Sequence, residues 1–176
     1  MPPVSEQTTR GVIAPVEHTS GQQQAYRHLA HVRTDGGHPP RPVLELVRTA
    51  VGQGRPVVLA CAPALADELR AALAGAGELR TVAAPPAGRP PEAVAAVAAL
   101  VDRELPAEGR LLLVTSAEPS TEGWQSSLQT DALLNHVLAE RPVDHLCVYP
   151  ADADGPAAAD AARATHPELL LSLIHI

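Results

Sequence analysis

The sequence predicts an α/β fold: a single three-layer domain in which helices cover both faces of a mostly parallel five-stranded sheet. Apolar runs of strand length alternate with stretches whose apolar residues recur every three or four positions. Short links containing Gly or Pro separate these segments. Several runs are continuously apolar, as strands covered on both faces are. Strand–helix alternation with short links favours right-handed crossovers and therefore a parallel sheet.

The first elements expected are a strand at 26–33, a helix at 43–51 and a strand at 56–62. The helix is indicated by apolar residues that share one face, namely Val43, Leu46, Val47, Ala50 and Val51. Gly52 and Gly54 follow this stripe and end the helix. The strand at 56–62 is predicted from its continuous apolar character.

The same alternation continues through the second half. The remaining elements expected are a helix at 65–73, a strand at 79–84, a helix at 90–105, a strand at 110–115, a helix at 120–140, a strand at 145–149 and a helix at 155–164. Gly75 and Gly77 close the first of these helices. Pro90 and Pro91 begin the next helix. Proline is tolerated in the first turn because the N–H groups there have no partner within the helix.

Composition excludes several classes of function. The 13 basic residues are all Arg, so the chain has no Lys for a phosphate-binding P-loop or for a Schiff base. A net charge of −7 argues against nucleic-acid binding, which needs clustered cations. No apolar segment is long enough to cross a membrane, and no secretory signal precedes the domain, so we expect a cytoplasmic location.

The two ends differ in composition from the middle. Residues 1–23 are rich in Pro, Ser, Thr, Gln and Gly without periodicity, which predicts a disordered tail before a domain at 24–170. The ending Leu171 to Ile176 contains two of the three Ile residues and matches the translation of a transposase adapter used in sequencing libraries. We therefore hypothesise that 171–176 is not native and that the natural protein continues further.

Candidate site residues lie where ligands bind in open parallel sheets, beyond the carboxyl ends of the strands. Glu118 follows the strand at 110–115, and Trp124, Asp131 and Asn135 share one stripe of the next helix. Asp131 and Asn135 either lie at the solvated edge of the buried face or project into a ligand crevice. Buried polar groups need hydrogen-bond partners, and a polar ligand can supply them.

Motifs for metal binding and catalysis are missing from the sequence. The eight His residues show no zinc-ligand spacing, and we expect most of them at the surface. Cys61 and Cys147 are interpreted as small buried hydrophobes. There is no G-x-S-x-G nucleophile motif, and nothing in the sequence supplies a partner that would tune Glu118 and Asp131 for acid–base work. We expect no metal, no cofactor and no catalysis.

Several short motifs occur in the order found in a known family. They are Glu118-Pro119, Trp124, Asp131-Ala132-Leu133-Leu134-Asn135, Cys147-Val148-Tyr149 and Thr165-His166-Pro167-Glu168-Leu169. Together with His28-Leu29-Ala30-His31-Val32-Arg33-Thr34-Asp35, they make residues 27–170 similar to the methanogen/methylotroph sensory domain, or MEDS domain. The family pattern has Tyr where this chain has Val32, and an Asp where it has Pro150.

The resemblance implies a bacterial signal-input module with a RecA-like, Rossmann-like core that lacks the phosphate loop. Such domains occur at the front of actinobacterial anti-sigma-factor regulators and of sensor histidine kinases, where they control transcription. It implies a small organic ligand bound near Glu118, Trp124, Asp131, Asn135 and Tyr149, with His28 as a further candidate. It also implies a C-terminal kinase or ATPase output domain, or an anti-sigma partner. His166-Pro167 is interpreted as a turn ending the last helix.

Two other classes of function stay open at this point. The domain could bind a protein partner without any small ligand. It could also be a small α/β enzyme that uses Glu118 and Asp131, although no nucleophile or cofactor loop is visible.

Overall fold

The computed structural model describes residues 25–33, 39–86, 89–117, 121–149 and 156–170. Within those ranges the side chains of 121–125, 156–159 and 161 are not described. The predicted tail at 1–23 and the proposed adapter translation at 171–176 therefore lie outside the described residues.

All the strand pairs in the described part of the chain are parallel, and they form one sheet in the order β3-β2-β4-β5-β1-β6. The elements are β1 (Tyr26–Val32), α1 (Arg41–Gly52), β2 (Val57–Ala60), α2 (Pro63–Ala72), β3 (Arg80–Thr81), α3 (Pro90–Glu104), β4 (Leu111–Ser116), α4 (Thr121–Val137), β5 (Val143–Tyr149), α5 (Pro156–Thr165) and β6 (Glu168–Leu169). The predicted α/β fold class is thus confirmed, with six strands in place of five.

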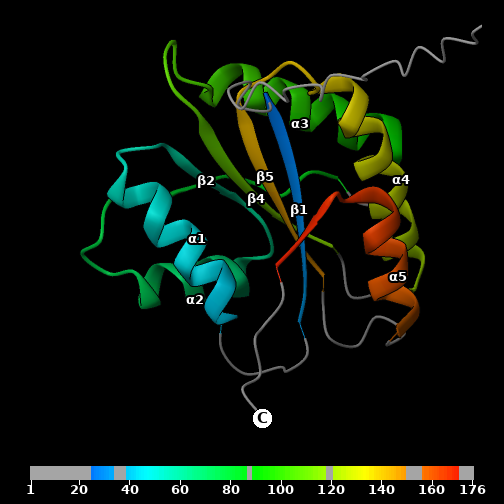
Figure 1. Ribbon diagram of the computed structural model, residues 1–176, viewed down its shortest axis with the longest axis horizontal. Coiled ribbons are helices and arrows are strands. Elements are labelled where there is room, and N and C mark those ends of the chain that lie inside the picture. Colours follow the sequence, from blue (N-terminus) through cyan, green and yellow to red (C-terminus); the bar gives the residue numbers. More distant parts are fainter. Residues whose placement is uncertain (1–24, 34–38, 87–88, 118–120, 150–155, 171–176) are drawn as a thin grey trace, which may run out of the picture.

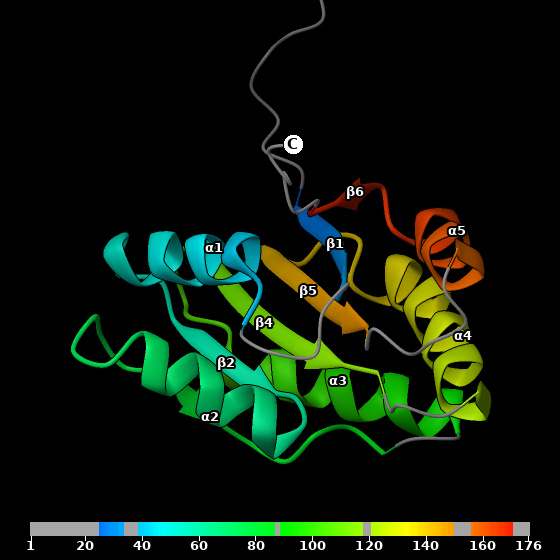
Figure 2. The ribbon, with the colours of Figure 1, turned by 90° about the horizontal axis from the view of Figure 1, so that it is seen from below.

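Helices cover both faces of the sheet, which gives three layers (Figures 1 and 2). On one face, α1 and α2 pack Val47 and Leu69 against strand residues such as Leu112. On the other face, α3 and α4 contribute Val97 and Leu134 to a second core. A smaller third cluster combines Ala30 of β1, Cys147 and Tyr149 of β5 and Ala162 of α5. Leu, Val and Ala dominate all three, as expected for a chain without Phe.

The differences from the predicted elements lie at short strands and strand ends. β6 was not predicted, because two residues are too few to show a periodicity; it pairs with the edge of β1. The strand expected at 79–84 pairs only at Arg80 and Thr81, and β5 starts at Val143, two residues earlier than expected.

An ion network sits on β5 near its amino end. The Asp144 side chain is 1% exposed and accepts hydrogen bonds from Arg55 and Arg110, each at 2.6 Å. Arg27 adds a third positive charge at 3.7 Å. The three arginines come from β1 and from the segments before β2 and β4, so the network joins three parts of the fold.

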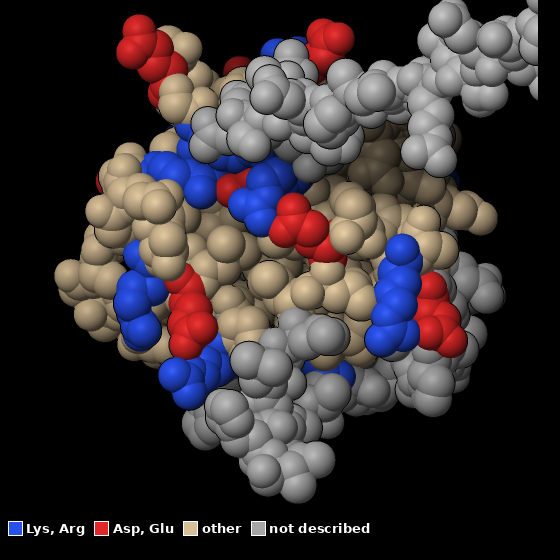
Figure 3. All heavy atoms as spheres, viewed as in Figure 1, with Lys and Arg blue, Asp and Glu red and all other residues tan. Residues whose placement is uncertain are grey.

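Charges of both signs are interspersed on the face shown in Figure 3, with uncharged surface between them. Among the described residues, no helix combines the length and the apolar character that a membrane span requires.

Candidate functional site

The site forms where the polar faces of β1 and β5 meet α4 and the end of α5. Side chains alternate along a strand, so His145, Cys147 and Tyr149 point to one side of β5 while Leu146 and Val148 point to the other. On the neighbouring strand, Tyr26 and His28 are placed on the same side by the register of the β1–β5 pair. Two parallel strands thereby present a polar strip to the helix layer.

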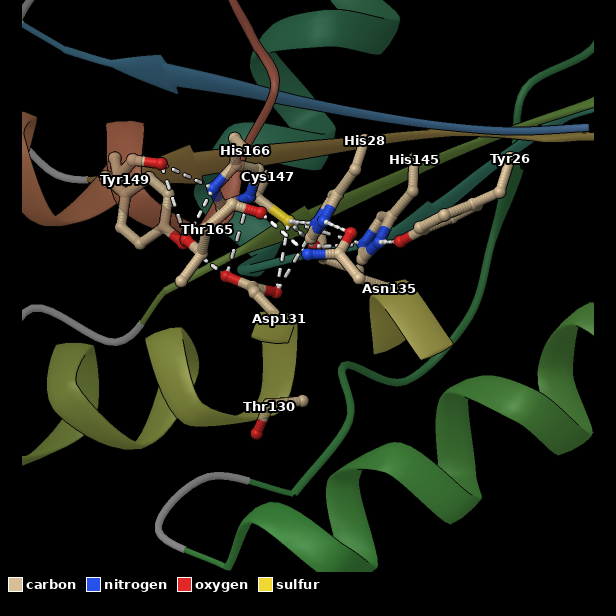
Figure 4. Close-up of polar contacts among 12 residues, drawn as sticks. Tyr26, His28, Thr130, Asp131, Asn135, His145, Cys147, Tyr149, Thr165 and His166 are labelled. Atoms are coloured by element: carbon tan, nitrogen blue, oxygen red, sulfur yellow. Dashed lines mark hydrogen bonds and ion pairs between the residues drawn. The ribbon is translucent and has the colours of Figure 1, made fainter. Parts of the chain in front are cut away.

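Four side chains of this strip converge on one point (Figure 4). They are His28 from β1, Asp131 from α4, Cys147 from β5 and His166, which follows α5. His28 Nε2 lies 3.3 Å from Cys147 Sγ and 3.7 Å from Asp131 Oδ1. Sγ lies 3.4 Å from the same Oδ1, and His166 Nε2 lies 3.6 Å from Asp131 Oδ2. All four residues are buried.

Backbone and amide oxygens orient the two histidines of this cluster. Asn135 donates through Nδ2 to the carbonyl of Thr165 at 2.8 Å, which turns its Oδ1 toward Nδ1 of His28 at 2.9 Å. Nδ1 of His166 lies 2.9 Å from the carbonyl of Ala162. Carbonyl oxygens only accept, so Nδ1 is protonated in both rings and Nε2 faces the cluster.

A second chain of hydrogen bonds ends at the sulfur. Thr115 Oγ1 donates to Cys147 Sγ at 3.4 Å, so it must accept from Nε2 of His145 at 2.9 Å. Nδ1 of His145 then accepts from the Tyr26 hydroxyl, also at 2.9 Å. The donors all point toward the sulfur, and such an arrangement stabilises negative charge there.

Burial disfavours the charged form of the groups around the cluster, so it lowers the pKa of His145 and His166 and raises the pKa of the Cys147 thiol. Burial and the nearby charge of His28 lower the pKa of His166 to about 4, and burial lowers the pKa of His145 well below its usual value. Both rings are therefore neutral at pH 7. Burial, followed by the charge of Asp131, raises the pKa of the Cys147 thiol well above its usual value.

Asp131 remains a carboxylate. Burial by itself would raise its pKa, but the neighbouring histidines, first of all His28, outweigh burial and lower it. The Tyr149 hydroxyl donates to Oδ2 of this carboxylate, which also favours the ionised form. Burial and nearby negative charges raise the pKa of Tyr149, so the phenol keeps the proton that it donates.

Two cavities flank the cluster. The first, of about 60 Å³, lies at the carboxyl ends of β4 and β5 and is lined by Thr115, Ser126, Thr130 and Asp131 together with apolar side chains from α3 and α4. The second, of about 450 Å³, is lined by residues that include His28 and His166. The four-residue cluster lies between them and contributes wall to both.

The loop after β2 uses a backbone donor that could otherwise face a phosphate. α2 begins at Pro63 directly after Ala62, and the Ala62 N–H donates to Ser116 Oγ at 2.9 Å. The amide nearest to the helix N-terminus is therefore used inside the fold, although helix N-termini commonly bind anions.

The structure brings together most of the residues that were singled out from the sequence. His28, Asp131, Asn135 and Tyr149 form one hydrogen-bonded group, and Asp131 is 5% exposed rather than solvated. Glu118 and the side chain of Trp124 lie outside the described residues.

The expectation that most histidines are at the surface is wrong for four of them. His28, His31, His145 and His166 are at most 3% exposed, because polar partners within the fold replace water. Cys147, His145 and His166 were not proposed as site residues. The alternation of His145, Cys147 and Tyr149 along one strand is the signal that could have found two of them.

Comparison with known protein families assigns the chain to one of them. The sequence profile described as "MEDS: MEthanogen/methylotroph, DcmR Sensory domain" matches residues 27–167. The chain belongs to the MEDS family. All the site residues described above except Tyr26 fall within the matched segment of this MEDS domain.

No curated protein matches the MEDS chain by sequence. Among solved structures, it is similar to a chain of Drosophila ORC bound to GC-rich DNA and Cdc6, with a TM-score of 0.36 and 16% identity. That match covers 83% of this chain and 49% of the other, so the chain spans about half the length of that relative. A chain of Drosophila ORC bound to DNA has a TM-score of 0.36 and 17% identity over 86% and 85% of the two chains.

Proposed function

We propose that this MEDS domain is a non-catalytic sensor that binds a small organic molecule in the 60 Å³ cavity beside Asp131. The observation that carries the proposal is the position and lining of that cavity. It lies at the carboxyl ends of β4 and β5, where open parallel sheets bind ligands, and buried polar groups line it opposite apolar side chains. Membership of a sensory family supports the same role.

The size and charge of the cavity restrict the ligand. With a volume of about 60 Å³ the first cavity is much smaller than the second, of about 450 Å³, which favours a small organic molecule. The Asp131 carboxylate disfavours anions and favours groups that donate hydrogen bonds. Short alcohols and amines fit this description better than short carboxylic acids do.

The signal itself follows from differential affinity. A ligand that binds one arrangement of α4 more tightly than another shifts the equilibrium between the two arrangements. The shift in free energy cannot exceed the difference between the two binding free energies. α4 carries Thr130 and Asp131 on its cavity side, whereas Leu133 and Val137 are 44% and 49% exposed on its outer side. We propose that an output domain of the kinase or ATPase type, or an anti-sigma partner, responds to this helix.

The test is a melting-temperature screen of the full chain against short alcohols, amines and carboxylic acids. A ligand at 100 times its Kd stabilises the protein by about 2.7 kcal/mol. Ser126→Leu fills the cavity from α4, so it should abolish the stabilisation by an alcohol or amine. Ala132→Leu adds the same side chain at an exposed position of α4 and should leave the stabilisation unchanged.

Two results would overturn the proposal. One is the absence of stabilisation by every compound, which would favour a domain that binds only a protein partner. The other is stabilisation that Ser126→Leu leaves intact, because the ligand would then bind elsewhere.

A further inference from the structure

The buried cluster at the centre of the site has the composition of a metal centre. We propose that His28, Asp131, Cys147 and His166 bind one divalent transition-metal ion in tetrahedral coordination, with zinc as the best match to their ligand atoms. This proposal does not depend on the organic ligand, because the four ligand atoms meet between the two cavities.

The contacts among His28, Cys147 and Asp131 Oδ1 have the spacing of tetrahedral zinc ligands, and His166 lies close enough to supply the fourth. Zinc binds nitrogen, oxygen and sulfur at about 2.0–2.3 Å, so its ligand atoms lie about 3.3–3.8 Å apart. The separations in the cluster are 3.3 Å between His28 and Cys147 and 3.4 Å between Cys147 and Asp131. Asp131 Oδ1 also lies 3.7 Å from His28 Nε2, whereas the 3.6 Å contact of His166 Nε2 is with the other carboxylate oxygen, Oδ2. All the ligand atoms lie within 4.8 Å of one another.

Both histidines are already oriented as metal ligands. A histidine that binds a metal through one nitrogen usually donates the other N–H to a carbonyl or carboxylate oxygen. Nδ1 of His28 faces the Asn135 amide oxygen and Nδ1 of His166 faces the Ala162 carbonyl, both at 2.9 Å. Each Nε2 is thereby directed into the cluster, where it can bind a metal ion in the form that carries no proton on that nitrogen.

An unpartnered nitrogen supports the presence of a cation. Nε2 of His166 is buried and has no hydrogen-bond partner, and it faces the Asp131 carboxylate at 3.6 Å. A lone pair that faces an anion without a proton between them is unfavourable in a dry interior. A metal ion bound by Nε2 of His166 and by the Asp131 carboxylate replaces this repulsion with two bonds, which accounts for the arrangement.

The charge of the ligands also matches a divalent ion. When Cys147 gives up its proton to solvent, its thiolate and the Asp131 carboxylate carry two negative charges, which neutralise the ion inside the fold. The donor from Thr115 stabilises the thiolate, and the Tyr149 hydroxyl occupies Oδ2 of Asp131. A sulfur and two imidazole ligands favour zinc over magnesium or calcium, which prefer oxygen.

The experiment measures zinc in the full chain without any organic compound present. Metal-depleted protein is titrated with Zn²⁺, and we expect one ion per chain. Cys147→Ser and His166→Ala should each weaken binding at least 100-fold. Asn135→Ala keeps all four ligands but removes the group that orients His28, so it should weaken binding by about 10- to 100-fold.

Matched controls separate ligand loss from damage to the fold. Cys61→Ser changes the other buried cysteine and His136→Ala changes an exposed histidine of α4, and both should bind zinc as the wild type does. Circular dichroism of each metal-free variant checks that it folds. With Co²⁺ in place of zinc, a sulfur-to-metal absorption band should appear in the wild type and in Cys61→Ser, and it should be missing in Cys147→Ser.

Three outcomes would overturn the metal proposal. They are less than one zinc per chain, equal binding by folded Cys147→Ser and the wild type, and no effect of Asn135→Ala. Zinc content and stabilisation by an organic compound are measured separately, so the failure of one proposal is distinguishable from the failure of the other. Because Asp131 belongs to the cluster and also lines the first cavity, the preference for groups that donate hydrogen bonds applies to the metal-free protein.

Discussion

Replacing Asp144 by asparagine should destabilise the domain severely. The side chain is 1% exposed, and its two oxygens accept from Arg55 and Arg110 at 2.6 Å each. Asparagine keeps the volume but removes the negative charge and turns an N–H₂ group toward cationic donors. The side chains of Arg55 and Arg110 are only 18% and 15% exposed, so water cannot replace the lost partner fully.

The expected loss is about 3–5 kcal/mol of unfolding free energy, the range for a buried ion pair that loses one partner. Domains are commonly stable by about 5–15 kcal/mol, so the variant should still fold but with a small margin. Urea denaturation followed by far-ultraviolet circular dichroism measures the change. With a slope near 2 kcal/mol/M, the midpoint should fall by about 2 M.

Asp102→Asn is the matched control. Asp102 pairs with Arg141 at 2.8 Å, but the two side chains are 55% and 47% exposed. An exposed pair contributes at most about 1 kcal/mol, so this variant should be close to the wild type. The reasoning is refuted if Asp144→Asn destabilises the domain no more than Asp102→Asn does.

Two further predictions concern other buried groups. Tyr149→Phe removes the hydroxyl that donates to the Asp131 carboxylate, so the free energy of unfolding in urea should fall by about 1.5–3 kcal/mol. Tyr26→Phe should cost less, because the Tyr26 hydroxyl donates to the neutral His145. A larger loss in Tyr26→Phe than in Tyr149→Phe would contradict the prediction. Burial raises the pKa of Cys61 to about 11, so alkylation of this thiol at pH 8 should be on the order of a hundredfold slower in folded protein than in urea. The alkylation rate of the folded protein should rise with pH up to about 11, and peptide mapping measures it. A rate that levels off near pH 8.5 would be incompatible with that burial.

Much of the fold was predictable because it depends on local patterns. The stripe on α1 and the continuous apolar character of β2 and β4 each require only neighbouring residues to be compared. β6 was not predicted because its two residues form a strand only by pairing with β1, which is distant in the sequence. The Asp144 network was missed for the same reason, since its arginines come from distant positions.

The candidate site was predictable only in part. Asp131 and Asn135 stood out because polar residues interrupt the apolar stripe of one helix, and the structure gives each of them buried partners. Cys147 and His166 did not stand out as ligands, because zinc motifs are recognised by close spacing. Here the four atoms come from β1, α4, β5 and the end of α5.

The sequence alone determined the alternation of strands and helices and the absence of a lysine for phosphate binding, because those features are written in neighbouring residues or in composition. Only the tertiary structure decided which polar side chains meet. The β1–β5 register brings His28 beside His145 across 117 residues of chain, and α4 then sets Asp131 against Cys147. Such meetings depend on strand order and helix packing, which no local pattern encodes.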